Sequence, residues 1–494
     1  MNDYRWPTWV ALSGLGLIAC LCGARTFADT SIVAPANFPA PRLESLRVPV
    51  SDPATPRGLS IKGWKTLTGT KVLFIRTTEL PMFDLHVSFA AGSARDGGTP
   101  GLAATTFGML NEGVPGKDLP AIVETFDGLG AQLEMTIDHE RANLVLRSLS
   151  DAQKSAPALH LFTQILGEPL LTDEALQRVK NELRDHLLFR SEQAGNSSEQ
   201  SVKALLAPGS PYSLPFYGTN QGLQSLSRQA VKDFHQRFYS ASHAQITVVG
   251  DLTLDQAKAI SLKVSNALPV MPVGTGATPM PALKPRGTKR TFHEEQPLTQ
   301  TSLILGQLGV SRQHPDYAAL YAANLIFGGT ANSRLMNELR ERRGLVYDVH
   351  SQNSHWASAG LMTISLQVSP SLSAGILTLT RSMFSDYLRD GPTQQELDQI
   401  KLRVTNMVAL DSASNKQILK QLVDINRHDL PIDIDYIAQQ VQRLTLKQIK
   451  EALNRHLAAD QWRVVTIGAT VNQQPLPAPP ATPPGTSSSA CVAP

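Results

Sequence analysis

The chain of 494 residues is 42% hydrophobic and 18% charged, the composition of folded globular domains rather than of a disordered or fibrous protein. Its 45 Lys and Arg residues nearly balance its 42 Asp and Glu residues, and the basic residues are scattered along the chain instead of forming a patch. A protein that binds nucleic acid is therefore disfavoured.

The N-terminal residues predict export from the cytoplasm. Arg5 precedes a short apolar run interrupted by glycines, and small residues follow, so we expect residues 1–28 to be a signal peptide cleaved after Ala28. Residues 17–20 also resemble a bacterial lipobox, and the alternative is therefore cleavage before Cys20 with a lipid anchor on its thiol. Either route predicts a periplasmic protein. No later stretch approaches about 18 uncharged apolar residues, so no transmembrane segment is expected.

Local patterns along the chain predict both strands and helices. Alternating polar and apolar residues indicate strands at 71–76, 84–89 and 142–147. Helical spacing indicates helices at 102–112, 118–129, 152–167 and 173–192. Capping boxes, in which two side chains satisfy each other's backbone donors, predict helix starts at Thr393 with Glu396 and at Thr445 with Gln448. Because strands and helices do not alternate strictly, we predict an α+β fold with helices packed on mainly antiparallel sheets.

A linker divides the body of the chain. Residues 268–288 are rich in Pro and Gly and lack periodicity, which separates an N-terminal half at 44–267 from a C-terminal half at 289–470. The Pro-rich residues 471–494 cannot bury a core and are expected to be a disordered tail.

The two halves share sequence blocks in the same order. A helical block ending at Lys180 recurs 221 residues later at Lys401, and a helix-strand block ending at Gly250 recurs 218 residues later at Gly468. Matched blocks at nearly one offset predict a duplicated unit of about 220 residues. The alternative is two unrelated helix-strand segments.

Short glycine-containing motifs follow the strand predicted at 84–89 in a definite order. They are Ala91-Gly92-Ser93, Arg95-Asp96, Gly101-Leu102-Ala103, Asn111-Glu112-Gly113 and Gly128-x-Gly130-Ala131, with Gly250-Asp251, Ser333-Arg334-Leu335 and Leu345-Val346-Tyr347 later in the chain. This order resembles the insulinase/pitrilysin family of inverted-zincin metallopeptidases, in particular its bacterial branch similar to the mitochondrial processing peptidase. The resemblance covers residues 60–470 and implies two homologous halves that face each other around a chamber.

The resemblance also shows which chemistry this chain lacks. In active members of the family the helix after Gly-Leu-Ala carries H-x-x-E-H, whose histidines bind Zn²⁺ and whose Glu deprotonates water. Here the aligned residues include Ala104, Phe107 and Gly108, none of which offers a metal ligand or a proton acceptor. We therefore expect no metal in this chain. The family's third ligand would fall near Glu182 and Asp185, which without two histidines are expected to lie on a solvated helix face.

Two other groups of titratable residues are assigned to the surface. His139-Glu140 and His293-Glu294-Glu295 are neighbours in or beside strands, where adjacent side chains point to opposite faces of the sheet. Neither forms a metal-binding pattern, and we expect ordinary surface roles for both.

One element of the family chemistry is retained in the second half. Arg340 and Tyr347 stand seven residues apart around Gly344, and the resemblance implies that they hold substrate carbonyls and the oxyanion in the active site. The alternative is that Arg340 complements a helix C-terminus and Tyr347 packs as a strand aromatic. Arg342 and Arg343 are expected to be solvated.

A chain without zinc ligands but with this pair resembles the non-catalytic subunit of a two-subunit peptidase. The resemblance implies a homologous partner subunit that carries the zinc, and an extended peptide substrate that adds to a sheet edge at Ala131, Gln132 and Leu133. The alternative is a catalytically inert binding or scaffold protein of the same fold. An autonomous peptidase with an unorthodox metal site would need ligands that the sequence does not offer.

Overall fold

The computed structural model describes residues 58–191, 194–270 and 288–479, and the predicted signal peptide lies outside them. The strands of the N-terminal half are β1 (Ile61–Lys65), β2 (Lys71–Arg76), β3 (Met82–Phe89), β4 (Gly113–Val114), β5 (Lys117–Asp118), β6 (Gln132–Ile137), β7 (Ala142–Leu149) and β8 (Ala244–Gly250). Those of the C-terminal half are β9 (Thr291–Glu295), β10 (Thr301–Gly309), β11 (Val346–His355), β12 (Gly360–Val368) and β13 (Arg463–Gly468).

The described strands form one large sheet in each half, and the two sheets repeat one topology. The first has the order β1-β2-β8-β3-β7-β6 and the second β11-β12-β10-β13-β9, with β4 and β5 in a separate hairpin. Read from opposite ends, β2-β8-β3-β7-β6 corresponds to β9-β13-β10-β12-β11. In both series the first pair is parallel and the following pairs are antiparallel. The predicted α+β fold of two homologous, mainly antiparallel halves is confirmed.

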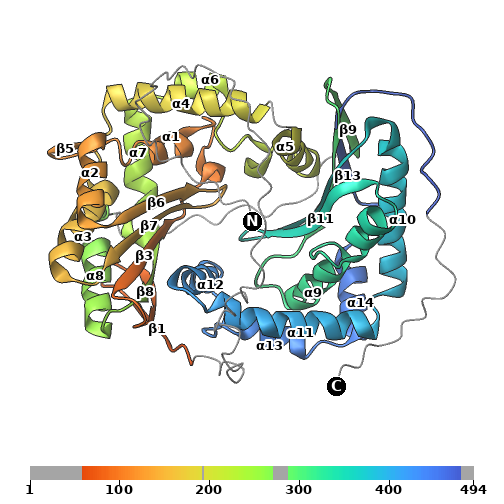
Figure 1. Cartoon of the computed structure of the whole chain (residues 1–494). Helices are drawn as coiled ribbons and strands as arrows, with labels where there is room; N and C mark the ends of the chain where they lie inside the picture. Colours follow the sequence, from red (N-terminus) through yellow and green to blue (C-terminus); the bar gives the residue numbers. More distant parts are fainter. Residues whose placement is uncertain (1–57, 192–193, 271–287, 480–494) are drawn as a thin grey trace, which may run out of the picture.

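Helices flank both sheets (Figure 1). In the first half they are α1 (Leu102–Gly108), α2 (Leu119–Leu129), α3 (Ala152–Gly167), α4 (Asp173–Ser191), α5 (Ala194–Leu206), α6 (Asn220–Ser225), α7 (Arg228–Phe238) and α8 (Leu254–Ala267), with short 3₁₀ turns η2 (Ser93–Arg95), η3 (Pro211–Ser213) and η4 (Ala241–His243). In the second half they are α9 (Tyr317–Phe327), the π-helical η5 (Met336–Arg342), η6 (Pro370–Leu372), α10 (Ser373–Asp390), α11 (Gln394–Asp411), α12 (Asn415–Arg427), α13 (Tyr436–Gln442) and α14 (Leu446–His456). Both predicted capping boxes are present, at the starts of α11 and α14.

The apolar face of each sheet packs on the helices of its own half. In β7 every second residue is buried, which places Leu144 and Leu146 in one cluster with Phe162 and Ile165 of α3. In the second half, Leu303 and Leu305 of β10 belong to the equivalent cluster. Strand alternation therefore decides which face of each sheet is left for contacts between the halves.

Each half also lends one helix to the sheet of the other (Figure 1). Val202 of α5 packs in one cluster with Ile304 of β10, and a Cβ added to Gly306 would lie 2.3 Å from the Val202 side chain. Reciprocally, Leu422 of α12 packs with Leu73 of β2. This exchange buries apolar surface between the halves and joins them into one body.

The structure differs from the predictions made from the sequence in two places. The helix predicted at 102–112 ends at Gly108, and the unpredicted hairpin of β4 and β5 follows it. The prediction of a disordered tail is wrong for residues 471–479, because Leu476 packs on the core of the second half, 2.8 Å from the position of a Cβ on Gly375; residues 480–494 lie outside the described residues. Gln474 N–H also donates to the Ser371 carbonyl at 2.8 Å.

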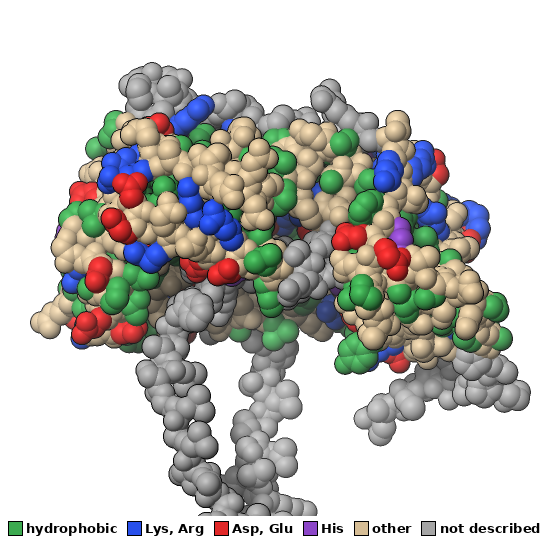
Figure 2. Space-filling model, turned by 90° about the horizontal axis from the view of Figure 1, so that it is seen from above, with side chains coloured by type: hydrophobic (Ala, Val, Ile, Leu, Met, Phe, Trp, Pro, Cys, Tyr) green, Lys and Arg blue, Asp and Glu red, His purple; other side chains and the backbone are tan. Residues whose placement is uncertain are grey.

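The surface agrees with the charge balance of the sequence. On the face shown in Figure 2, Lys and Arg side chains are interspersed with Asp and Glu side chains. Among the described helices, none has the length and apolar character needed to cross a bilayer.

Candidate functional site

The helix that aligns with the metal-binding motif is a core element. Every residue of α1 after Leu102 is buried. Ala104 packs with Val179 and Leu183 of α4, while Phe107 belongs to the main core of the first half. Ala104 carries a methyl group, Phe107 a phenyl ring and Gly108 no side chain. None of them has a lone pair that could bind zinc, so α1 does not fit a zinc ion.

The Arg95-Asp96 motif serves this helix structurally. Asp96 is buried, and its two carboxylate oxygens accept the backbone N–H groups of Gly101 and Ala103, each at 2.7 Å. Burial raises the pKa of Asp96 to about 7, although these hydrogen bonds favour its charged form. Gly101 has a φ of +105°, a conformation that side chains rarely adopt.

The acidic residues of α4 differ from each other in environment. Asp185 is exposed, as expected, but Glu182 is half-buried. Burial, together with the carboxylates of Glu112 and Asp185, raises the pKa of Glu182 above its ordinary value. Glu182 is therefore not a freely solvated helix residue.

The structure brings Arg340 and Tyr347 together. Arg340 lies in η5, a π-helical turn of the kind often found at functional sites. Gly344, with a φ of +59°, reverses the chain, and its N–H donates to the Arg340 carbonyl at 2.9 Å. The guanidinium then lies over the Tyr347 ring, 5.4 Å from its centroid.

A bulge in β11 exposes Tyr347. Val346 pairs with Val368 and Val349 with Leu366, so three steps along β11 match two along β12. The extra residue turns the side chain outward, and Tyr347 is 84% exposed. The alternative role as a packed strand aromatic is therefore wrong for Tyr347.

The surroundings of the pair include residues that the sequence did not indicate. Asp348 and His350 lie beside Tyr347 on the same edge strand, with His350 Nδ1 3.1 Å from Asp348 Oδ2. Asp348 follows Tyr347 directly in the sequence, but the spacing of Asp348 and His350 matches no metal-binding or catalytic motif.

Both neighbouring arginines are paired, but the Arg342 side chain is 57% exposed, as expected, whereas the Arg343 side chain is 18% exposed. Arg342 and Arg343 both contact the Glu338 carboxylate, at 2.6 Å and 2.7 Å. Among the acidic side chains that the structure describes, Arg340 approaches Glu341, at 3.5 Å, and its own side chain is 45% exposed. The three arginines therefore differ, and Arg340 is directed toward Tyr347.

The predicted peptide-binding edge lies at the start of β6. Gly130, with a φ of +64°, ends α2 and leads the chain into the strand. Ala131 is buried, Gln132 exposed and Leu133 half-buried. Within its sheet β6 pairs only with β7, so its other edge has no strand neighbour in the described residues. Ala131, Gln132 and Leu133 thus lie at an edge strand, and their role in binding stays a prediction.

The surface assignment of His139 and Glu140 is wrong, since both are buried. His139 Nδ1 lies 2.9 Å from Ser93 Oγ. The Glu140 carboxylate accepts hydrogen bonds from the Tyr212 hydroxyl at 2.5 Å and from the Ala357 N–H of the other half at 2.8 Å. The turn between β6 and β7 inserts the Glu140 side chain between the halves. By contrast, His293 is exposed, as expected.

One histidine cluster has the composition of a metal site. His314, Asp316 and His456 place ligand atoms within 4.8 Å of one another. Their atoms are already engaged, since His456 Nε2 and Arg455 contact the Asp316 carboxylate and the Asp316 N–H donates to His314 Nδ1. These hydrogen bonds and ion pairs join the end of α14 to the start of α9.

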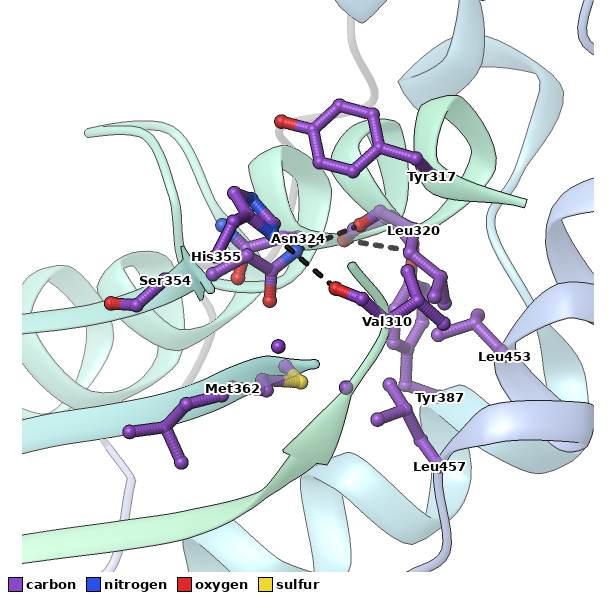
Figure 3. A pocket seen from close by; sticks show the side chains of 15 residues that line it. Val310, Tyr317, Leu320, Asn324, Ser354, His355, Met362, Tyr387, Leu453 and Leu457 are labelled. Atoms are coloured by element: carbon purple, nitrogen blue, oxygen red, sulfur yellow. Dashed lines mark hydrogen bonds between the residues drawn. The ribbon is translucent and has the colours of Figure 1, made fainter. Parts of the chain in front are cut away.

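A small cavity lies between α9 and the strands β10 to β12 (Figure 3). His355 Nδ1 is 3.4 Å from the Val310 carbonyl oxygen there, and Tyr317 and Leu320 contribute to the lining. Its volume of about 20 Å³ has room for about one water molecule. It is too small to hold a peptide.

The fold and these sites define a peptidase-type chain in which the metal-binding helix has become part of the core. A family model described as the peptidase M16 inactive domain matches residues 225–404. The crystal structure of a peptidase M16 inactive domain from Pseudomonas fluorescens is 39% identical, with a TM-score of 0.81 over 85% of this chain and 100% of that chain. The chain belongs to peptidase family M16, the insulinase/pitrilysin family.

More distant relatives agree with this assignment. A protein of Helicobacter pylori described as the non-peptidase homolog YmxG is 23% identical over 391 residues, which are 78% of this chain and 88% of the relative. An uncharacterized zinc protease of Mycobacterium bovis is also 23% identical, over 87% of this chain and 98% of its own length. The structure of a protease from Helicobacter pylori, 16% identical with a TM-score of 0.76 over 83% of this chain and 99% of that chain, shares the fold. This chain is an M16 homologue without the zinc-binding motif.

Proposed function

We propose that this chain is the non-catalytic subunit of a heterodimeric zinc metallopeptidase. The observation that carries the proposal is the exposed Arg340–Tyr347 pair, held by a π-helical turn and a bulge although α1 does not fit a metal. A scaffold protein needs neither an outward-facing phenol nor a guanidinium stacked on it.

The pair supplies contacts for a polarised peptide. A guanidinium carries positive charge and a phenol donates a hydrogen bond, which suits a carbonyl oxygen that becomes negative during hydrolysis. Arg340 and Tyr347 would hold this oxygen, while the edge of β6 at Gln132 receives the extended peptide as an added strand. The zinc ion and the water that it activates belong to the partner subunit.

Reconstitution tests this proposal. We expect the chain purified from its native host to co-elute with a homologue that carries H-x-x-E-H, and peptide hydrolysis to need both chains. Elution alone, or with an unrelated complex and without hydrolysis, would instead support the inert scaffold. About one zinc per purified single chain by elemental analysis would contradict the division of roles.

We also propose a periplasmic location. Its basis is the sequence of residues 1–28, and intact-mass analysis of the protein from its native host distinguishes the two routes of processing. We expect a mature N-terminus at Asp29 in the periplasmic fraction. An N-terminal Cys20 with added acyl mass in the membrane fraction would establish the lipid anchor instead.

A further inference from the structure

The turn between β6 and β7 contacts the second half through charged side chains, of which Glu140 is buried and Asp138 and Arg427 are partly exposed. It presents Asp138 and Glu140 toward the second half. Arg427, at the end of α12, contacts Asp138 at 2.7 Å and Glu140 at 3.2 Å. Ala357, in the turn between β11 and β12, donates its N–H to the same Glu140 carboxylate at 2.8 Å. One buried carboxylate thus binds two separate elements of the other half.

The first half holds this turn firmly. The Tyr212 hydroxyl donates to Glu140 at 2.5 Å, and the Tyr212 ring packs on Trp356 of the second half with centroids 4.5 Å apart. The Gly92 N–H donates to the Glu140 carbonyl, and a Cβ on Gly92 would lie 2.4 Å from the backbone of the turn. The Ala91-Gly92-Ser93 motif therefore packs directly against the backbone of this turn and holds it in place.

The electrostatics of the cluster favour its paired form. Although burial opposes ionisation, the Arg427 guanidinium holds the pKa of Asp138 below its ordinary value. Burial and the Glu140 carboxylate raise the pKa of Tyr212, which keeps its hydroxyl protonated as a donor. Removing the Arg427 guanidinium while the halves stay together would leave the Glu140 carboxylate buried without its counter-charge, which is strongly unfavourable.

The cluster lies at equivalent ends of the two edge strands. β6 runs from Gln132 toward the turn that carries Glu140, and β11 runs from Val346, beside Tyr347, toward the turn that carries Ala357. We infer that Glu140 and Arg427 are positioning residues, which lock the halves together and fix the separation between the edge of β6 and the Arg340–Tyr347 pair. The consequence for peptide binding rests on the proposed function, whereas the rigidity does not.

Distance measurements between spin labels test the lock directly. The protein has three cysteines, at 20, 22 and 491, so a chain without residues 1–28 and with Cys491→Ser accepts labels at chosen sites. Val123 of α2 and Leu402 of α11 are 49% and 64% exposed and lie in different halves. With both changed to Cys and labelled, we expect one narrow distance distribution for the parent.

Two variants remove the lock and one serves as a matched control. Glu140→Gln and Arg427→Met are each expected to widen the distribution about twofold or more. Lys416→Met removes another ion pair between the halves, the exposed contact with Glu134 at 3.6 Å. Because an exposed pair contributes little, this variant should leave the width of the distance distribution unchanged. Unchanged widths for both lock variants would overturn the inference.

A milder variant covers the case in which the lock variants do not fold. Tyr212→Phe removes one donor from Glu140 and leaves Arg427 and Ala357 in place, so circular dichroism should show a folded chain with an intermediate width. Labels in this single chain report rigidity without partner or peptide. If the lock variants widen the distribution but hydrolysis by the reconstituted pair is unchanged, the lock stands and its link to peptide binding fails.

Discussion

A single extra residue in β11 determines the exposure of Tyr347. In a regular strand, every second side chain points to the same face, so Tyr347 would share the buried face of Val349. The bulge between Val346 and Val349 breaks this alternation. Gly344 makes a second contribution, because its φ of +59° lets the chain reverse between η5 and β11. The Arg340–Tyr347 contact thus depends on two local departures from regular structure.

The first prediction concerns these two side chains. Arg340→Ala and Tyr347→Phe should each lower kcat of the reconstituted pair by about 10²- to 10³-fold, the effect of removing one oxyanion donor. Association with the partner, measured by gel filtration, should be unchanged because both side chains are largely exposed. Turnover equal to that of the parent would end the proposed role of the pair.

Arg342→Ala is the matched control for this prediction. Arg342 lies two residues from Arg340 but pairs with Glu338, and its side chain is 57% exposed. Its loss should change kcat by less than about twofold, since an exposed ion pair contributes little. An equal decrease in kcat for Arg340→Ala and Arg342→Ala would mean that any lost positive charge in this region lowers the rate, and that Arg340 has no specific role.

At the scale of the element, α1 has exchanged a metal-binding face for a packing face. Restoring the motif with Ala104→His, Phe107→Glu and Gly108→His would place polar side chains in a buried, apolar site. We expect the free energy of unfolding in urea to fall by at least about 3 kcal/mol, with no stoichiometric zinc by elemental analysis. A stable variant with one zinc per chain would contradict the view of α1 as a core helix.

Helix α12, which packs on the sheet of the first half, should contribute strongly to the stability of the protein. Leu422 is fully buried against the sheet of the first half, and Leu422→Ala should lower the free energy of unfolding by about 2–5 kcal/mol. Leu402→Ala on α11, where the side chain is 64% exposed, should change it by less than about 0.5 kcal/mol. Similar values for the two variants would mean that α12 contributes little to the joining of the halves.

Buried histidines in both halves link the stability of the protein to pH. Burial lowers the pKa of His86 to about 3 and the pKa values of His355 and His428 to about 4. Histidines in the unfolded chain have pKa values near 6.5, so the unfolded chain binds more protons between about pH 6.5 and 4. The stabilisation is complete above pH 6.5 and decreases as the pH falls through this window.

Urea unfolding at pH 7.5 and pH 5 measures this dependence. Each buried histidine should account for on the order of 1–2 kcal/mol of the loss at pH 5. Replacement of His428 by Asn should reduce the difference between the two pH values, whereas replacement of the exposed His160 should not. The comparison between variants is needed because Asp96, whose pKa burial raises to about 7, has the opposite effect on stability in this pH range. An equal pH dependence of stability for the parent and the His428 variant would refute the linkage.

Much of the fold could be predicted from local sequence. The helix at 152–167 and the strand at 71–76 agree with their patterns, and the two capping boxes begin helices where expected. The end of α1 and the packing of residues 471–479 could not be predicted in this way, because both depend on contacts with residues far away in the sequence. The sequence also placed Glu140 on the surface, since alternation within a strand says nothing about a turn that enters another half.

The duplicated α+β architecture and the missing metal motif can be read from the amino-acid sequence, because periodicity, repeats and ligand types are local properties of the chain. The exposure of Tyr347 beneath Arg340 and the burial of Glu140 between the halves became apparent in the folded chain alone. The first depends on the register of β11 against β12 and the second on the docking of α12. Both arise from pairings between residues far apart in the chain, which no local pattern encodes.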